Sequence, residues 1–90
     1  MTVVAVKIKV MPTSPETNLK QLEKNIGDTL KGNGVKNPNF EIHPIAFGLK
    51  ALVVMFGWPE EKELEFLEEE LKEINNVSSI EVLDIRRAIG

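Results

Sequence analysis

The sequence contains no cysteine. This absence excludes disulfide bonds, thiolate zinc sites and thiol catalysis, and it fits a reducing compartment. Histidine is almost as scarce, because His43 is the only one and stands directly before a proline. A nucleophilic triad needs such a base beside a serine, threonine or cysteine, so we do not expect an enzyme that works through a covalent intermediate.

Long apolar runs are missing as well. The longest, residues 51–56, is far shorter than the roughly 20 residues of a membrane-spanning helix. The start of the chain alternates between apolar and polar residues, unlike the continuous apolar stretch of a signal peptide. We therefore expect no membrane contact and a cytoplasmic protein, and we expect residues 1–90 to form a single domain.

The net charge is −3, which argues against a protein that binds nucleic acid directly by neutralising phosphates. The charge is unevenly spread. Residues 1–57 contain seven lysines and four acids, whereas residues 58–73 contain eight glutamates and two lysines. The acidic stretch is either a docking face or, as we favour, the solvated face of a helix with an ordinary Glu68–Lys72 pair.

Apolar spacing predicts four strands and two helices. A period of two, or a continuous apolar run, predicts strands at residues 3–11, 40–43, 49–56 and 80–85. Asn18 with Gln21 three residues later is typical of a helix start, and an apolar stripe from Leu19 to Leu30 follows it. A second amphipathic helix is predicted to begin at Pro59 and to end before Asn75.

The order of these elements is strand, helix, strand, strand, helix, strand. Two right-handed strand-helix-strand units share one sheet only by interleaving, which predicts the antiparallel strand order 4132 with both helices on one face. We therefore expect an α+β, ferredoxin-like two-layer sandwich.

Several kinds of chemistry known from such sandwiches find no support. Glu41 and His43 point to the same side of a strand, but a tight metal site asks for three or four ligands. RNA-recognition modules stack bases on central-strand aromatics, and here only Phe56 is available. An acylphosphatase-like site needs an arginine in the loop after the first strand, which has none. We assign no catalytic residue, no metal and no cofactor.

Two features remain as candidates for binding. Phe47 lies in the turn between the second and third strands, between Ile45 and Gly48. An exposed ring there would be a binding anchor, and the alternative is that it folds back against the first loop and the helix ends. The second feature is the pair Arg86 and Arg87 near the end of the chain, which taken alone is most often a frayed basic tail.

Three blocks of sequence resemble one known family. They are VKIKVMPTSPETNL at residues 6–19, PIAFGLKAL at 44–52 and IEVLDIRR at 80–87, in the same order and at matching distances. The family is the beta subunit of archaeal translation elongation factor one, the guanine nucleotide exchange factor for the alpha subunit. The proline-led turn with its aromatic and glycine is the most specific of the three blocks.

The resemblance implies a ferredoxin-like guanine-nucleotide-exchange domain whose partner is the elongation factor one alpha GTPase. Ile45, Phe47 and Gly48 would enter a pocket on the second domain of the GTPase. Arg86, Arg87 and Ile89 would press on its magnesium and switch region. Eukaryotic members place a lysine one residue from the end, whereas this chain ends in Arg-Arg-Ala-Ile-Gly, so Arg86 or Arg87 would supply the cation.

The predicted topology separates these two regions. Because the third and fourth strands run parallel, the turn that begins one and the tail that ends the other lie at opposite ends of the sheet, roughly 25–30 Å apart. A small rigid domain, expected to be a monomer on its own, could then touch two domains of one partner.

The competing hypothesis is a regulatory small-molecule-binding domain that acts as a dimer. It would use the open face of the sheet, where we expect Lys7, Lys9 and Lys50 beside Val54 and Phe56.

Overall fold

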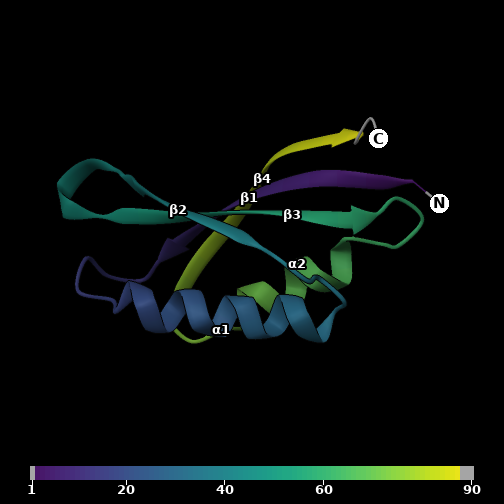
Figure 1. The fold of residues 1–90 in the computed structure, drawn as a ribbon. Helices are drawn as coiled ribbons and strands as arrows, with labels where there is room; N and C mark the ends of the chain where they lie inside the picture. The colour runs from purple at the N-terminus through teal and green to yellow at the C-terminus, as the bar shows by residue number, and fades with distance from the viewer. Residues whose placement is uncertain (1, 88–90) are drawn as a thin grey trace.

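The computed structural model describes residues 2–87, which form a four-stranded sheet with two helices on one side (Figure 1). The elements in chain order are β1 (Val3–Pro12), α1 (Leu19–Gly32), β2 (Asn39–Pro44), a tight turn at Ala46–Gly48, β3 (Lys50–Pro59), α2 (Glu65–Lys72) and β4 (Val77–Arg87). This is the ferredoxin-like sandwich that the sequence predicts.

The strands lie in the order β2-β3-β1-β4, which is the predicted order 4132 viewed from the other edge. All three neighbouring pairs are antiparallel, so β1 in the interior of the sheet runs opposite to both β3 and β4. It follows that β3 and β4 run parallel to each other with β1 between them, as the topology requires.

The core lies between the sheet and the helices. The even-numbered residues of β1 are buried, and the apolar stripes of both helices face them. The most completely buried large side chains include Ile8, Leu22, Ile26, Leu30, Leu67 and Leu71. Within residues 2–87 no polar or charged residue is buried. The alternation of β1 and the three-four spacing of the helices therefore account for the core directly.

The start of α1 agrees with the sequence prediction. The side-chain Oδ1 of Asn18 accepts a hydrogen bond of 3.1 Å from the backbone N–H of Gln21. This bond satisfies one of the N–H groups that a first helical turn leaves without a partner.

The start of α2 differs from the prediction. Pro59 is the last residue of β3 and pairs with Val3, and α2 begins only at Glu65. Gly57 likewise lies inside β3 and does not close it. The pairing with β1 extends β3 beyond the apolar run. Pro59 can be its last residue, because at a strand end the missing N–H of proline costs no hydrogen bond of the ladder. The chain then turns, and the N–H of Lys62 donates to the C=O of Pro59 at 3.1 Å.

Trp58 explains why β3 continues this far. Its indole ring is buried, and its Nε1–H donates to the backbone C=O of Lys62 at 2.9 Å. The Lys62 ammonium lies 4.7 Å from the ring centroid, a cation–π contact. These contacts hold the turn after β3 in place.

The open face of the sheet is also different from the expectation. Val54 and Phe56 are buried on the helix side, so they do not belong to that face. Lys7 and Lys9 pair instead with Met55 and Val53, which share their side of the sheet. A shift of one residue along a strand reverses the face, and the pairing register decides it.

Neither helix within residues 2–87 is long and apolar enough to cross a membrane.

Ile26 offers a direct test of this core. Replacing this fully buried side chain by alanine leaves a cavity, and we expect Ile26→Ala to lower the free energy of unfolding by about 3 kcal/mol. Urea unfolding measures this change. The exposed neighbour variant Lys24→Ala should change the value by less than about 0.5 kcal/mol. A loss below about 1 kcal/mol in Ile26→Ala would contradict the packing described.

Candidate functional site

The two predicted binding regions lie at opposite ends of the sheet. Val4 of β1 pairs with both Trp58 and Arg87, so the end of β4 is level with the end of β3. The β2–β3 turn lies at the other end, where β3 begins. The eight steps from Lys50 to Trp58 correspond to about 26 Å, and the longest dimension of the molecule is 41 Å. Figure 1 shows the β2–β3 turn and the end of β4 on opposite sides of the view. We call these regions the hairpin pole (residues 42–49) and the arginine pole (residues 83–87).

The tip of the hairpin pole is a tight turn of unusual composition. The N–H of Leu49 donates to the C=O of Ala46 at 3.2 Å, and the two residues between them both have positive φ. Phe47 has φ 60° and ψ 33°, and Gly48 has φ 77°. This is the geometry of a type I′ turn, which suits the right-handed twist of a hairpin and favours Asn-Gly at its centre.

Phenylalanine is energetically unfavourable at this position of the turn, so its presence indicates a role other than stabilising the fold. The left-handed backbone costs a residue with a β-carbon roughly 1–2 kcal/mol. The side chain is 96 % exposed, so it gains almost nothing from the core in return. The alternative in which the ring folds back against the first loop is therefore wrong. A strained backbone that presents an exposed aromatic is typical of a binding anchor.

Two isoleucines extend the apolar surface of the hairpin pole. Ile45 is 40 % exposed and Ile42 is 52 % exposed on the adjoining strand. The N–H of Ile45 donates to the C=O of Leu49 at 2.7 Å, which closes the hairpin just below the turn. Ile42 was not among the predicted site residues. Its place on the edge strand next to Pro44 is the signal that could have suggested it.

At the arginine pole, both arginines belong to β4 and are not a frayed tail. Arg86 pairs with Ala5 and Arg87 with Val4 in the sheet, so the strand continues two residues beyond the predicted end. Ile89, the third residue predicted for this pole, lies outside the described residues.

Each arginine forms an ion pair. The Nη2 and Nε of Arg87 donate to Oε1 of Glu60 at 2.6 and 3.1 Å. The Nε of Arg86 lies 2.7 Å from Oδ2 of Asp84. Both guanidinium groups are largely exposed, and exposed ion pairs contribute at most about 1 kcal/mol. These ion pairs therefore position both guanidinium groups, and breaking them costs little free energy.

A bulge in β4 brings apolar groups to the same pole. Lys7 pairs with Asp84 and Ile8 with Val82, so Leu83 is the extra residue. Leu83 and Ile85 are about half exposed. Bulges at sheet edges redirect side chains, and this one could not be located from the alternation of β4.

Glu41 and His43 do form the pair that their spacing suggests, with 2.9 Å between Oε1 and Nε2. Residues 2–87 hold no group of three or more potential metal ligands. The pair is a hydrogen bond on the surface of the edge strand.

Comparison with known families gives one match over nearly the whole chain. Residues 5–88 match the family described as the EF-1 guanine nucleotide exchange domain.

Several archaeal proteins named Elongation factor 1-beta are similar to this chain. The protein from Sulfurisphaera tokodaii is 44% identical over 89 residues, covering 97% of both chains. The protein from Methanococcus aeolicus is 39% identical over 87 residues, covering 94% of this chain and 97% of its own. The protein from Methanocaldococcus jannaschii is 37% identical over 89 residues, covering 98% of this chain and all of its own.

Solved structures share the fold at low sequence identity. The ACT domain from GTP pyrophosphokinase of Chlorobium tepidum superposes with a TM-score of 0.66 at 15% identity, covering 93% of this chain and 90% of its own. The designed protein Foldit4 superposes with a TM-score of 0.62 at 21% identity, covering 98% of both chains. These likenesses support the ferredoxin-like architecture alone.

The strain at Phe47 predicts an unusual gain in stability. Asn tolerates the left-handed backbone better than Phe, so Phe47→Asn should raise the free energy of unfolding by about 0.5–1 kcal/mol. Chemical denaturation measures the change. Phe66→Asn is the matched control, because Phe66 is also exposed but lies in the regular helix α2, where no gain is expected. A less stable Phe47→Asn would mean that the ring supports the fold.

Proposed function

Because this chain belongs to the family of EF-1 guanine nucleotide exchange domains, we propose that it promotes exchange of GDP for GTP by gripping the elongation factor one alpha GTPase at two separate places. The observation that carries the mechanism is the strained, exposed Phe47 at the opposite end of the sheet from Arg86 and Arg87. One rigid body with two such ends acts as a strut between two domains of its partner.

The hairpin pole supplies affinity in this proposal. Ile45, Phe47 and Gly48 enter an apolar pocket on the second domain of the GTPase. The turn already holds the ring outward in the free protein, so binding requires little ordering of the hairpin. A buried aromatic anchor of this kind is commonly worth 2 kcal/mol or more.

The arginine pole supplies the effect on the nucleotide. Arg86 or Arg87 leaves its carboxylate partner and approaches the magnesium and switch region of the GTPase. A cation close to Mg²⁺ weakens the binding of the metal by repulsion, and GDP is then held less tightly. Ile89 is proposed to contact the same region.

Differential affinity is what makes this arrangement an exchange factor. A partner that binds the GDP-bound and the empty GTPase equally well changes neither population. The repulsion at the magnesium site weakens only the complex that contains nucleotide, so the empty state is preferred until GTP enters. The proposal involves no covalent chemistry and no cofactor of this chain's own. Residues 1–90 act as one exchange domain, in the cytoplasm where translation takes place.

The hypothesis of a dimeric regulatory domain is not favoured. The family match supports exchange activity, and the similarity to an ACT domain extends to the fold alone. The expected ligand-binding face also lacks Val54 and Phe56, which are buried.

Phe47 is the first test of the strut. We expect Phe47→Ala to weaken binding to the GDP-bound GTPase by at least about 2 kcal/mol, roughly 30-fold in Kd, with no loss of fold. Isothermal titration calorimetry measures the affinity. Phe66→Ala removes a comparably exposed ring on α2 and should leave the Kd unchanged. Equal affinity of Phe47→Ala and the original protein would refute the anchor.

The arginines are tested by the rate of nucleotide release. We expect Arg86→Gln with Arg87→Gln to slow GDP release from the GTPase by about tenfold or more, while binding weakens much less. Stopped-flow release of a fluorescent GDP analogue gives the rate, and titration gives the affinity.

The matched control is Lys72→Gln, which removes an exposed charge from α2. With Lys72→Gln, GDP should leave the GTPase as fast as with the original protein. If GDP leaves equally fast with the double arginine variant, the proposed role of the arginine pole is refuted.

A further inference from the structure

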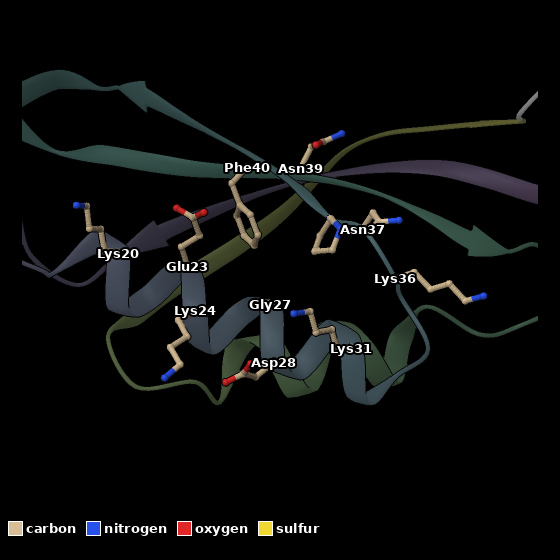
Figure 2. A pocket seen from close by; sticks show the side chains of 11 residues that line it. Lys20, Glu23, Lys24, Gly27, Asp28, Lys31, Lys36, Asn37, Asn39 and Phe40 are labelled. Atoms are coloured by element: carbon tan, nitrogen blue, oxygen red, sulfur yellow. The ribbon is translucent and has the colours of Figure 1, made fainter.

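A groove on the helix side of the sheet belongs to neither pole. It lies between α1 and the edge strand β2 and encloses about 720 Å³ (Figure 2). Its lining includes Gly27 of α1 and Phe40 of β2. The groove is on the edge of the sheet opposite to β4, so contacts at the arginine pole leave it accessible.

The floor of the groove is apolar because α1 has no side chain at one position. Figure 2 shows the Phe40 ring directed from β2 toward α1, close to Gly27. A β-carbon built on Gly27 would lie 4.0 Å from Cζ of Phe40. A longer side chain would meet the Phe40 ring or enter the groove beside it. Glycine inside a helix is unfavourable compared with alanine, so the close approach of the Phe40 ring to α1 comes at some cost to the helix.

The rim beside this floor is an unpaired strand edge. Among the strands of the described chain, β2 pairs only with β3. Ile45 donates its N–H across to Leu49, and hydrogen-bonded pairs alternate along an antiparallel ladder. The N–H and C=O groups of Phe40 and Ile42 therefore point away from β3. They form a row of donors and acceptors that another extended chain can use.

The groove carries an excess of positive charge in an acidic protein. Lys20, Lys24 and Lys31 of α1 and Lys36 of the following loop line it, against two carboxylates, Glu23 and Asp28. None of the four lysines forms an ion pair with another side chain of residues 2–87. A ligand that suits this rim is negatively charged.

We propose that this groove binds an extended acidic segment of a partner protein, which adds a fifth strand to the edge of β2. Its main chain pairs with Phe40 and Ile42, its apolar side chains cover Phe40 and Gly27, and its carboxylates meet the lysines. Strand addition beside a helix is an established mode of peptide recognition, in which the main chain supplies affinity and alternate side chains supply specificity. The groove itself lies outside both poles, and the added strand meets the hairpin pole only at Ile42.

A synthetic peptide that alternates charge and apolar residues probes the site in the full chain. Fluorescence anisotropy at low salt should show saturable binding of labelled acetyl-EVELEVE-amide and at least about tenfold weaker binding of acetyl-KVKLKVK-amide. Amide shifts in the NMR spectrum should be confined to residues 20–31 and 36–43.

Two variants separate the parts of the proposal. Gly27→Leu fills the groove and should weaken the acidic peptide by about tenfold while the thermal midpoint stays the same or rises. Ile42→Pro removes an outward N–H from an edge strand, which tolerates proline, together with the isoleucine side chain, and Ile42→Ala is the control that loses the side chain but keeps the N–H. Ile42→Pro should bind the acidic peptide about tenfold more weakly than Ile42→Ala. If Ile42→Pro lowers the thermal midpoint, Gly27→Leu decides the question.

The proposal is overturned by any of four results. The acidic peptide does not saturate by about 1 mM, the basic peptide binds equally well, or the shifts map to α2 or the open sheet face. The fourth is a dimer in analytical ultracentrifugation that Gly27→Leu abolishes, which would mean that a second copy of this chain occupies the groove.

Discussion

The pairing of β1 with both β3 and β4 is the constraint on which the rest of the molecule depends. Two right-handed strand-helix-strand units can share a sheet only if their strands interleave. Because β1 is antiparallel to both neighbours, β3 and β4 run in the same direction. The turn before β3 and the end of β4 are therefore about 26 Å apart or more. The same interleaving puts both helices over one face, where they close the core.

The residues that are proposed to contact the GTPase are not needed for the stability of the free domain. Ile26 is fully buried and supports the fold, whereas Phe47 is exposed on a strained backbone. Arg86 and Arg87 form ion pairs with exposed carboxylates. Such pairs are weak, so the arginines can exchange them for contacts with the GTPase. Strain and weak pairing at the surface are tolerated because the core between sheet and helices supplies the stability.

The two edge strands, β4 and β2, differ in how readily another strand could pair with them. β4 carries a bulge at Leu83 and ends in two paired arginines, features that discourage another strand from adding there. β2 has Pro44 next to its turn, but beside Phe40 it borders an open groove with a basic rim. In the functions proposed above, the two ends of the molecule act on the GTPase, and the β2 edge remains for a second partner.

The sequence by itself determined the elements and the family, because both are written in local patterns. The alternation of β1, the stripe from Leu22 to Leu30, the cap at Asn18 and the turn block around Phe47 are each contained in a few neighbouring residues. Only the tertiary structure decided that the Phe47 ring points outward, that Pro59 ends a strand, and that Arg87 meets Glu60. The last two outcomes depend on strand register and on contacts between residues 27 or more positions apart, and the first on the left-handed turn that holds the ring away from the core; no local period encodes them.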